Sequence, residues 1–598
     1  MPVPARRRRR SFDPAPHRRV LTALIDEIAA AGALDARGLD RIVRRHPKRG
    51  GVFSKSEIIA GFRAFGGAGA LSEDRFVARL RLRPVRTLSG VTPVTVLTKP
   101  FPCPGTCIFC PSDVRMPKSY LADEPGAQRA EDNHFDPYLQ TWNRLDAYRA
   151  MGHPVDKVEL IVLGGTWSFH PEPYQLWFVT RCLDALSDFG AGIDGRADAG
   201  VASVSYREIE PIDGRAPRRR YNQAVRSHLA ANLEGGTLLH VSERGRWDTL
   251  QAAQLRNETA GARCVGLVVE TRPDHVSEEE VLRLRGLGVT KLQLGIQSLD
   301  DAVLLRSRRG HGVAATRRAV RRLRAAGFKI HAHWMPNLPG ASPAADVADF
   351  ARLFADPDFR PDELKLYPCM LVESAELMGP YARGEWRPYD DEELLEVLTA
   401  CMADTPRWCR LTRVVRDFSA HDIVAGTHTA NLREVADRRL REQGRPCRDV
   451  RSREIRGASF EPTSLVLRTS AYETSVGAEQ FLEFVTPEDR LVAFLRLALP
   501  REPCFVDEIR DSALLREVHV YGASLPLGER AGGAAQHVGL GRALVEAAAS
   551  RAGEAGFEDL AVISAIGTRV WYRGQGFVDG PLYQHLPLRV PETTPVSI

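Results

Sequence analysis

The chain has 598 residues, of which 43% are hydrophobic and 26% are charged, and its formal net charge is +6 at pH 7. This composition excludes a small disulfide-stapled module and a disordered chain, and at roughly 100–200 residues per domain the length predicts several domains. No apolar run approaches the roughly 18–20 residues of a membrane span, and the segment MPVPARRRRR lacks the apolar core of a signal peptide. We therefore expect a cytoplasmic protein with no membrane partner.

The positive charge is concentrated in residues 1–50, which carry thirteen basic and five acidic side chains. Residues 1–20 are rich in Arg, Pro and Ala and have no hydrophobic period, which predicts a flexible basic arm. From Val20 onward apolar residues recur at helical spacing, and Ser54 begins a pattern typical of a capped helix. We expect a small helical region over residues 21–85.

From Thr92 onward, short β-branched runs alternate with helical stretches. This repeated βα order predicts an α/β protein with a parallel sheet or a βα barrel over residues 86–390 and functional groups at the carboxyl ends of its strands. Residues 190–246 break the rhythm, and we expect a surface insertion there with Arg218, Arg219 and Arg220 exposed. Residues 391–462 have a charged, helical pattern and are interpreted as a linker. The pattern of residues 463–598 predicts a last domain that begins with antiparallel strands.

Three cysteines follow the first predicted strand of this region. Cys103, Cys107 and Cys110 have C-x3-C-x2-C spacing, so three thiolates on one loop can face one point. A [4Fe-4S] cluster held by three cysteines keeps one iron open for the amino and carboxylate groups of S-adenosylmethionine. The alternatives are a zinc site that recruits His134 and unrelated buried cysteines. Structural zinc sites usually pair two C-x2-C knuckles, so the spacing favours the iron–sulfur cluster.

Polar groups at the ends of three predicted strands are candidates for binding S-adenosylmethionine. Charged and amide side chains inside apolar strands need partners, and glycines after a strand free backbone N–H groups. The candidates are Gly164, Gly165, Thr166, Glu270, Arg272, Gln293 and Gln297. A structural salt bridge is the alternative for Glu270 and Arg272.

The last domain contains a second motif, the glycine-rich turn Gly539-Leu540-Gly541 between a predicted strand and a predicted helix. Such a turn favours a pyrophosphate at the helix N-terminus, and the preceding strand could pair with pantetheine amides by its edge. The order strand, turn, helix, strand and short helix matches a GNAT acetyltransferase fold. Tyr572 is expected near a thioester sulfur, either as an acid or as a contact.

The two modules together make the sequence resemble a known family from about Val91 to Leu586. The resemblance rests on KPFPCPGTCIFCP, CVGLVVETRPD, KLQLGIQS, DELKLYPC, EVHVYG, QHVGLG and ISAIGTRVWYRGQGF. These segments are similar to the catalytic subunit of Elongator and its stand-alone bacterial and archaeal relatives, the tRNA uridine carboxymethyltransferases. The resemblance implies a radical S-adenosylmethionine domain with a partial (βα) barrel, joined to a C-terminal GNAT acetyltransferase domain.

The resemblance also implies a reaction and its participants. A radical formed from S-adenosylmethionine at the cluster, with an external electron donor, would activate the methyl group of acetyl-CoA. The product would be 5-carboxymethyluridine at the wobble position of tRNA. The implied acetyl-CoA contacts are Lys157, Glu517, Val518, His519, Val520, Gly539, Leu540, Gly541, Trp571 and Tyr572, with Lys157 and Tyr572 as the catalytic candidates.

The basic arm and the helical region are expected to contact tRNA, since arginines neutralise phosphates and stack on unpaired bases. The candidates are Arg6, Arg7, Arg8, Arg9, Arg10, Arg18 and Arg19. A solubilising tail is the alternative, and a homodimer is left open.

Three departures from the family pattern limit what the resemblance implies. Trp571 stands where many relatives have a tyrosine, so either it or Tyr572 could contact the thioester. Only Cys447 is present where some relatives have a cysteine-rich zinc segment, so we expect no zinc. The insertion at residues 190–246 has no assigned role.

Other functions fit part of the pattern. The main alternative is an N-acetyltransferase of proteins or small amines whose radical domain is structural. Another radical modification of tRNA, such as methylthiolation, would not need the acyl-CoA domain. A non-catalytic RNA-binding protein would not need the three cysteines.

Overall fold

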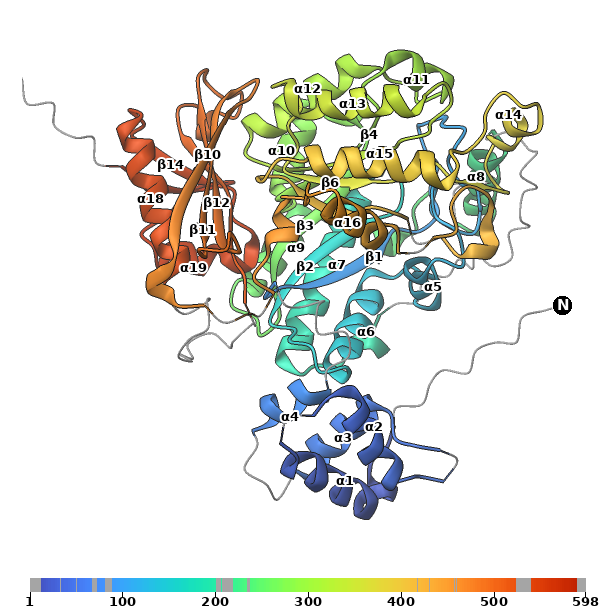
Figure 1. The fold of residues 1–598 in the computed structure, drawn as a ribbon, viewed down its shortest axis with the longest axis vertical. Helices are drawn as coiled ribbons and strands as arrows, with labels where there is room; N and C mark the ends of the chain where they lie inside the picture. The colour runs from blue at the N-terminus through green and yellow to red at the C-terminus, as the bar shows by residue number, and fades with distance from the viewer. Residues whose placement is uncertain are drawn as a thin grey trace, which may run out of the picture. The chain divides into compact units, whose positions relative to one another are not determined.

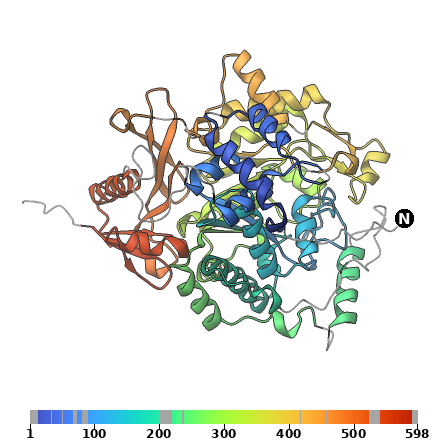
Figure 2. The same cartoon turned by 90° about the horizontal axis from the view of Figure 1, so that it is seen from below.

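The structure is a computed structural model that describes residues 12–32, 34–49, 51–66, 72–80, 89–199, 206, 219–233, 237–416, 418–429, 431–456, 458, 460–522 and 539–588. The chain divides into two compact units. One is Met1–Leu88 with Asn143–Val155, and the other is Ser89–Trp142 with Asp156–Ile598. Among the described residues, no helix is both long and apolar enough to cross a membrane. Figures 1 and 2 show the elements of each unit.

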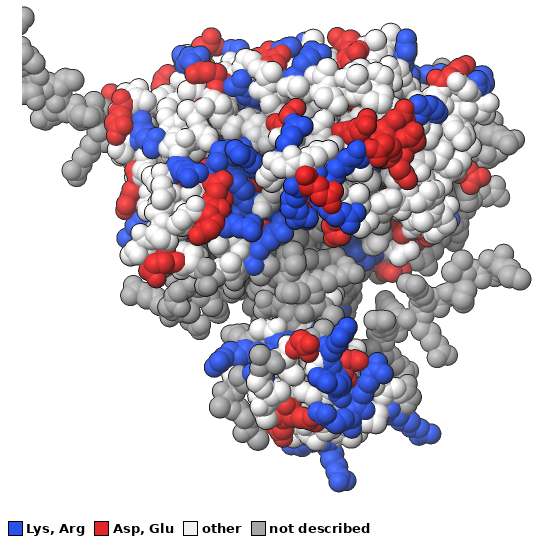
Figure 3. Space-filling model, viewed as in Figure 1, with Lys and Arg blue, Asp and Glu red and all other residues white. Residues whose placement is uncertain are grey.

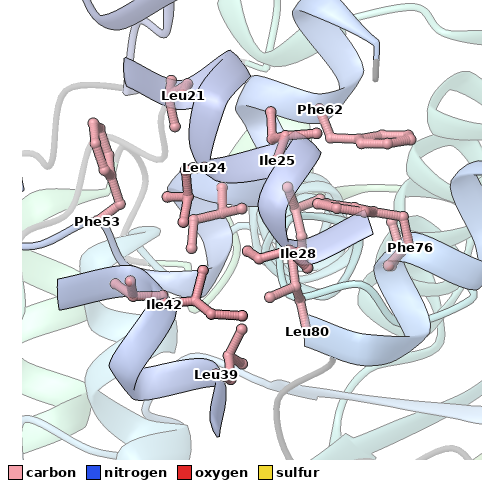
Figure 4. Packing of buried hydrophobic residues seen from close by; sticks show 14 residues of the cluster. Leu21, Leu24, Ile25, Ile28, Leu39, Ile42, Phe53, Phe62, Phe76 and Leu80 are labelled. Carbon is pink, nitrogen blue, oxygen red and sulfur yellow. The ribbon is translucent and has the colours of Figure 1, made fainter. Parts of the chain in front are cut away.

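The first unit is a helical bundle, as the apolar spacing predicted. It contains α1 (Arg18–Ala30), α2 (Ala36–Arg45), α3 (Lys55–Phe65) and α4 (Glu73–Leu80). Leu21, Leu24, Ile25 and Ile28 form one buried stripe of α1 and pack in a single cluster with residues of the other helices (Figure 4). The predicted cap of α3 is present, because Ser54 and Glu57 form a reciprocal capping box.

The second unit begins with a parallel sheet of seven strands. Neighbouring strands pair in the order β1 (Thr92–Leu97), β2 (Lys157–Leu163), β3 (Arg263–Thr271), β4 (Lys291–Gln297), β5 (Lys329–Trp334), β6 (Glu363–Leu366) and β8 (Arg410–Arg413). The connections between strands include α7 (Glu172–Ala191), α9 (Trp247–Asn257), α10 (Glu278–Gly286), α11 (Asp301–Arg306), α12 (Val313–Ala325), α13 (Pro343–Ala355) and α15 (Asp391–Asp404). The repeated βα order is confirmed, and the open sheet is a partial barrel.

Side chains alternate between the two faces of this sheet. In β4, Leu292, Leu294 and Ile296 lie on one face and are buried. Lys291 and Gln293 lie on the opposite face, which also carries polar residues of β3, β5 and β6: Glu270, His331, His333, Glu363 and Lys365. One face of the sheet is therefore polar although it lies inside the protein.

Residues 391–462 differ from the predicted helical linker. They contain α15, α16 (Leu432–Glu442) and α17 (Val450–Arg453), but also β9 (Ile423–Ala425), which pairs with β7 (Leu371–Val372), and β8, the seventh strand of the parallel sheet. The sequence RLTR of β8 is short and polar, so it lacks the apolar run that marks a buried strand. The predicted exposure of Arg218, Arg219 and Arg220 falls outside the side chains that the structure describes.

The second sheet of this unit is mixed. Its order is β10 (Val466–Glu473), β11 (Gly477–Val485), β12 (Leu491–Pro500), β13 (Ala513–Val520), β14 (Asp559–Val562), β16 (Gln584–Pro587) and β15 (Val578–Asp579). The first four strands are antiparallel, as predicted, whereas β13 and β14 are parallel. The chain also forms α18 (Leu540–Glu554) and α19 (Arg569–Arg573).

Buried ion pairs join the two sheets. Asp362, at the start of β6, accepts hydrogen bonds from Arg516 of β13 at 3.1 and 2.6 Å and from the Ile330 backbone N–H at 2.8 Å. Arg516 also donates to Glu479 of β11, which pairs with Arg324 of α12 at 2.6 Å. The side chains of Asp362, Arg324 and Arg516 are fully buried. Each charge in this interface therefore depends on its partners.

We expect Asp362→Ala to lower the free energy of unfolding of the second unit by about 3–5 kcal/mol, because it leaves the Arg516 guanidinium buried beside one carboxylate instead of two. Urea denaturation followed by circular dichroism measures this change. The matched control is Asp507→Ala, since Asp507 is exposed and pairs only with Arg510 of its own turn in the described chain. This control should change stability by less than about 1 kcal/mol. Equal effects of the two substitutions would contradict the structural role of Asp362.

Candidate functional site

The cysteine loop follows β1 at the carboxyl edge of the parallel sheet. Its backbone is held from several directions. Thr106 Oγ1 donates to the Arg308 carbonyl at 2.8 Å, and the Ile108 N–H donates to the Ser307 carbonyl at 3.2 Å. The Ile108 carbonyl accepts the Leu377 N–H at 2.9 Å. Cys107 is buried, while Cys103 and Cys110 are partly buried.

Cationic side chains surround the three thiols. Arg309 Nη1 lies 3.3 Å from Cys107 Sγ. Burial and the neighbouring thiols raise the pKa of Cys110, whereas the positive charge of Lys118 acts to lower it. Arg272 reaches the loop at Gly105, where a Cβ would lie only 2.0 Å from its Nη1 atom. A side chain at position 105 would therefore displace the Arg272 guanidinium from the loop.

The site fits a [4Fe-4S] cluster with S-adenosylmethionine, because it holds unpaired polar groups beside the thiols. Within the described part of the chain, Arg272 Nη1, Arg309 Nε and Gln297 Oε1 are buried and have no hydrogen-bond partner. Gln297 also has a left-handed φ of 71° at the end of β4. A buried polar atom without a partner is unfavourable unless a ligand satisfies it. Thiolates with adjacent cations are a donor set suited to an anionic iron–sulfur cluster.

The glycine pair after β2 lies at the same edge. Gly164 and Gly165 have φ of 127° and 95°, a region that favours glycine. A Cβ on Gly164 would lie 2.1 Å from Thr98 Oγ1, which already donates to the Gly164 carbonyl at 3.0 Å. This contact places the turn directly beside the start of the cysteine loop.

Deeper along the polar face of the sheet, a group of titratable side chains surrounds Gln293. His333 Nε2 lies 3.1 Å and Lys365 Nζ 2.5 Å from Gln293 Oε1. His333 Nδ1 is 3.8 Å from Glu270, which also accepts from Tyr120 at 3.4 Å. The Glu270 side chain is still 22% exposed. We name these residues, Tyr120, Glu270, Gln293, His333 and Lys365, the polar recess.

Burial dominates the electrostatics of the polar recess. It raises the pKa of Glu270, and it lowers the pKa of His333 well below its usual value, so His333 is neutral. Burial also lowers the pKa of Lys365 to about 7, although the charge of Glu270 acts in the opposite direction. The polar recess therefore holds a lysine that changes its charge near neutral pH.

The acyl-site candidates gather around β13. The pairing of β13 with β14 ends at Leu515, while β13 continues to Val520 beside β12. The register between β12 and β13 shifts at Arg516, which has no residue of β12 opposite it. This irregularity lies next to Leu515, where the pairing of β13 with β14 ends. A Cβ on Gly541 would lie 3.4 Å from the Trp571 ring and 3.6 Å from Val520. Trp571 and Tyr572 contact each other edge to face at 4.8 Å.

Two of the acyl-site candidates have other partners. The Glu517 carboxylate pairs with Lys329 and, at 2.9 Å, with Arg496, so its side chain serves the interface between the sheets. His519 Nε2 lies 3.1 Å from the Ser89 carbonyl.

A third acyl-site candidate, Lys157, begins β2 at the amino edge of the parallel sheet, where it pairs with Arg263 of β3. The Cβ of Arg263 is close to Gly567, which belongs to the domain of the second sheet. Lys157 is thus at the edge opposite the cysteines.

Sequence reasoning missed several side chains that line the site. Arg309 and Lys118 lie in loops, and nothing in their local pattern marks them. Lys365 and His333 could have been found, because each is polar inside an apolar strand, which is the same signal that identified Gln293. The basic candidates Arg18 and Arg19 are exposed at the start of α1, whereas Arg6, Arg7, Arg8, Arg9 and Arg10 lie outside the described residues.

Family models match the parallel-sheet region. The Radical SAM superfamily model matches residues 243–353, and the Radical_SAM C-terminal domain model matches residues 361–442. Proteins of this superfamily use a [4Fe-4S] cluster and S-adenosylmethionine, so the chain is an enzyme with these cofactors.

Curated relatives match most of the chain. The tRNA uridine(34) acetyltransferase of Methanocaldococcus infernus is 37% identical over 514 residues, which cover 83% of this chain and 86% of the relative. The protein of the same name from Dehalococcoides mccartyi is 38% identical, covering 84% and 99%. Elongator complex protein 3 of Homo sapiens is 32% identical, covering 84% and 85%.

A solved structure agrees with these relatives. The archaeal Methanocaldococcus infernus Elp3 with an N-terminal deletion aligns with a TM-score of 0.65 at 34% identity, covering 83% of this chain and 99% of that one. The agreement extends over nearly the whole solved chain. The chain therefore belongs to the family of the tRNA uridine(34) acetyltransferases and Elongator complex protein 3.

Proposed function

We propose that this enzyme modifies the wobble uridine of tRNA and forms 5-carboxymethyluridine with acetyl-CoA as the source of the added carbons. The observation that carries the proposal is the presence, in one compact unit, of the cysteine site and a second, mixed sheet in which the pairing of β13 with β14 ends at Leu515. The family relationship supports tRNA as the substrate, because relatives bear the name tRNA uridine(34) acetyltransferase. The cluster and S-adenosylmethionine, when bound, supply the one-electron chemistry that activates an unreactive C–H bond.

The GNAT assignment of the last domain is supported by three features, one each of β13, α18 and α19. The pairing of β13 with β14 ends at Leu515, and we assign the backbone of residues 517–520, beyond this point, to the pantetheine amides. Gly539 is the N-cap of α18, and no described side chain caps this helix, so its first N–H groups could bind a pyrophosphate. Tyr572 is buried, and burial raises its pKa, so it stays protonated and can donate to a thiolate.

In the radical domain, Cys103, Cys107 and Cys110 would hold the cluster. Gly164, Gly165, Thr166, Arg272 and Gln297 would bind S-adenosylmethionine at the carboxyl edge of the sheet. Glu270 and Gln293 lie in the polar recess, so we assign them to the side facing the substrate. There the Lys365 ammonium would orient an electronegative oxygen of the substrate, and neutral His333 would keep Gln293 in place.

The helical unit would contact tRNA. On α2, the side chains of Arg37, Arg41, Arg44 and Arg45 are exposed, and Figure 3 shows basic side chains gathered on this unit. Such a cluster suits a phosphate backbone. Together with Arg6–Arg10, Arg18 and Arg19, the arginines of α2 would form an extended electrostatic contact with the tRNA backbone.

A plain N-acetyltransferase is the competing function. It would leave the unpaired Arg272, Arg309 and Gln297 atoms and the three thiols without a role. It also predicts acetylation of amines in the absence of S-adenosylmethionine, and this distinguishes the two functions.

Reconstituted protein incubated without air with dithionite, S-adenosylmethionine, acetyl-CoA and bulk tRNA should form 5-carboxymethyluridine, detected by nucleoside mass spectrometry. Cys107→Ala should abolish the product while changing tRNA affinity less than about twofold, because the thiolate serves the cluster and not the phosphates. Cys182→Ala, which alters a buried cysteine of α7, is the matched control and should keep activity. Acetyl-CoA turnover without modified uridine or 5′-deoxyadenosine would support the plain acetyltransferase instead.

Replacing Arg6–Arg10 with serine should weaken tRNA binding and reduce its salt dependence, by roughly 0.7–0.9 in the slope of log affinity against log salt for each lost phosphate contact. This change spares Phe12 and His17, which stack on each other at 5.6 Å. The control removes the same net charge from exposed, ion-paired arginines of the other unit: Arg321, Arg383, Arg387, Arg501 and Arg510. If the slope of log affinity against log salt is the same for the two variants, residues 1–20 make no specific contact with tRNA.

Lys365 should titrate near neutral pH, as its ammonium predominates below about pH 7 and its neutral amine above. In protein labelled with 13C at lysine Cε, we expect one resonance with a midpoint near pH 7 that is missing in Lys365→Arg. Lys55→Arg should leave this titration in place. If the resonance lost in Lys365→Arg instead has a midpoint near that of a free lysine, the polar recess is more hydrated than the structure indicates.

A further inference from the structure

The insertion at residues 190–246 contains a helix that packs against the cysteine loop. This helix, α8 (Arg219–Asn232), presents Tyr221, Val225 and Leu229 at four-residue spacing, and all three are fully buried. They belong to one hydrophobic cluster with Val114 and Met116, which follow Cys110 on the loop. The insertion is thus anchored to the segment that carries the thiols.

Asn222 of α8 binds the backbone of a cysteine directly. Its Oδ1 accepts the Cys103 N–H at 3.0 Å, and its Nδ2 donates to the Cys103 carbonyl at 3.0 Å. The carboxamide therefore pairs with both polar groups of one residue, as a neighbouring β-strand would. An asparagine on a helix ordinarily bonds to its own backbone or to water, but Asn222 reaches a residue 119 positions away.

The same helix holds the other end of the loop. The Tyr221 hydroxyl donates to the Met116 carbonyl at 2.9 Å. Lys118 Nζ lies 4.9 Å from the centre of the Tyr221 ring and donates to Ser112 Oγ. The two attachment points are Cys103 itself and Met116, and Cys107 and Cys110 lie between them.

We propose that α8 is a clamp for the iron–sulfur site. Through Asn222 it fixes the backbone at Cys103, and through Tyr221 it fixes the backbone at Met116, beyond Cys110, so that the loop keeps the shape that retains the cluster. Main-chain contacts of this kind limit the conformations of an irregular loop, and groups outside the ligand set orient the ligands of a metal centre. Asn222 and Tyr221 are positioning residues, since they bind backbone groups of the loop and need not contact the cluster.

The clamp predicts how fast the cluster is lost. In anaerobic reconstituted protein with an excess of an iron chelator, Asn222→Ala should lose the visible absorbance of the cluster about tenfold faster, as expected for removing two backbone hydrogen bonds. Asn232→Ala is the matched control, because Asn232 is exposed on the same helix and bonds to the His228 carbonyl. The control should lose the cluster at the wild-type rate. A wild-type rate for Asn222→Ala would overturn the proposal.

A second pair of measurements separates the clamp from general stability. The melting temperature of cluster-free Asn222→Ala should stay within about 1 °C of that of the control. Tyr221→Phe keeps the ring and removes only the bond to Met116, so it should accelerate cluster loss less than Asn222→Ala but more than Asn232→Ala. If both variants lose the cluster only in proportion to a lowered melting temperature, α8 is a general packing element and the proposal fails.

Discussion

The arrangement of the two sheets depends on the buried charges between them. Asp362 sits between Arg516 and Arg496. Burial would raise the pKa of Asp362, but the charges of Arg516, Arg496 and Arg324 outweigh it and hold the pKa well below its usual value. A buried network of this kind requires each partner at one position, because a displaced partner leaves a desolvated charge. It therefore fixes β13 against the amino ends of β5 and β6.

This constraint extends along the polar face of the parallel sheet. Lys329 pairs with Glu517 of the second sheet and, at 3.1 Å, with Glu363. Glu363 in turn lies 3.1 Å from Lys291 and 3.3 Å from His331. The His331 ring is 5.7 Å from that of His333 in the polar recess. Charged and polar side chains thus form a continuous chain of contacts from the interface with the second sheet toward the carboxyl edge of the parallel sheet. The polar face of this sheet is therefore a buried core in which each side chain is held by its neighbours.

The sequence predicted the parts of this structure that depend on local pattern. Apolar runs located β1 to β5, and the spacing of Cys103, Cys107 and Cys110 located the loop at the carboxyl edge. The strand β8 was missed because RLTR has no apolar run. Helix α8 was missed because the segment around it is rich in Gly and Arg. The contacts of Asp362 with Arg516 and of Asn222 with Cys103 join residues more than a hundred positions apart, and no local period encodes such pairs.

The geometry sets a condition on any reaction that uses both ends of the barrel. The cysteine loop lies at the carboxyl edge of the sheet, whereas Glu517 meets Lys329 at the amino end of β5. A strand of six or seven residues rises about 20 Å, which is several times the 3–3.5 Å at which two atoms react. If acetyl-CoA binds along β13 as proposed, its acetyl group must come within reach of the cysteine site during turnover. Sliding of the two sheets would separate Asp362 from Arg516, which is costly for a buried pair. We therefore expect the movement to come from the substrate or from segments outside the network.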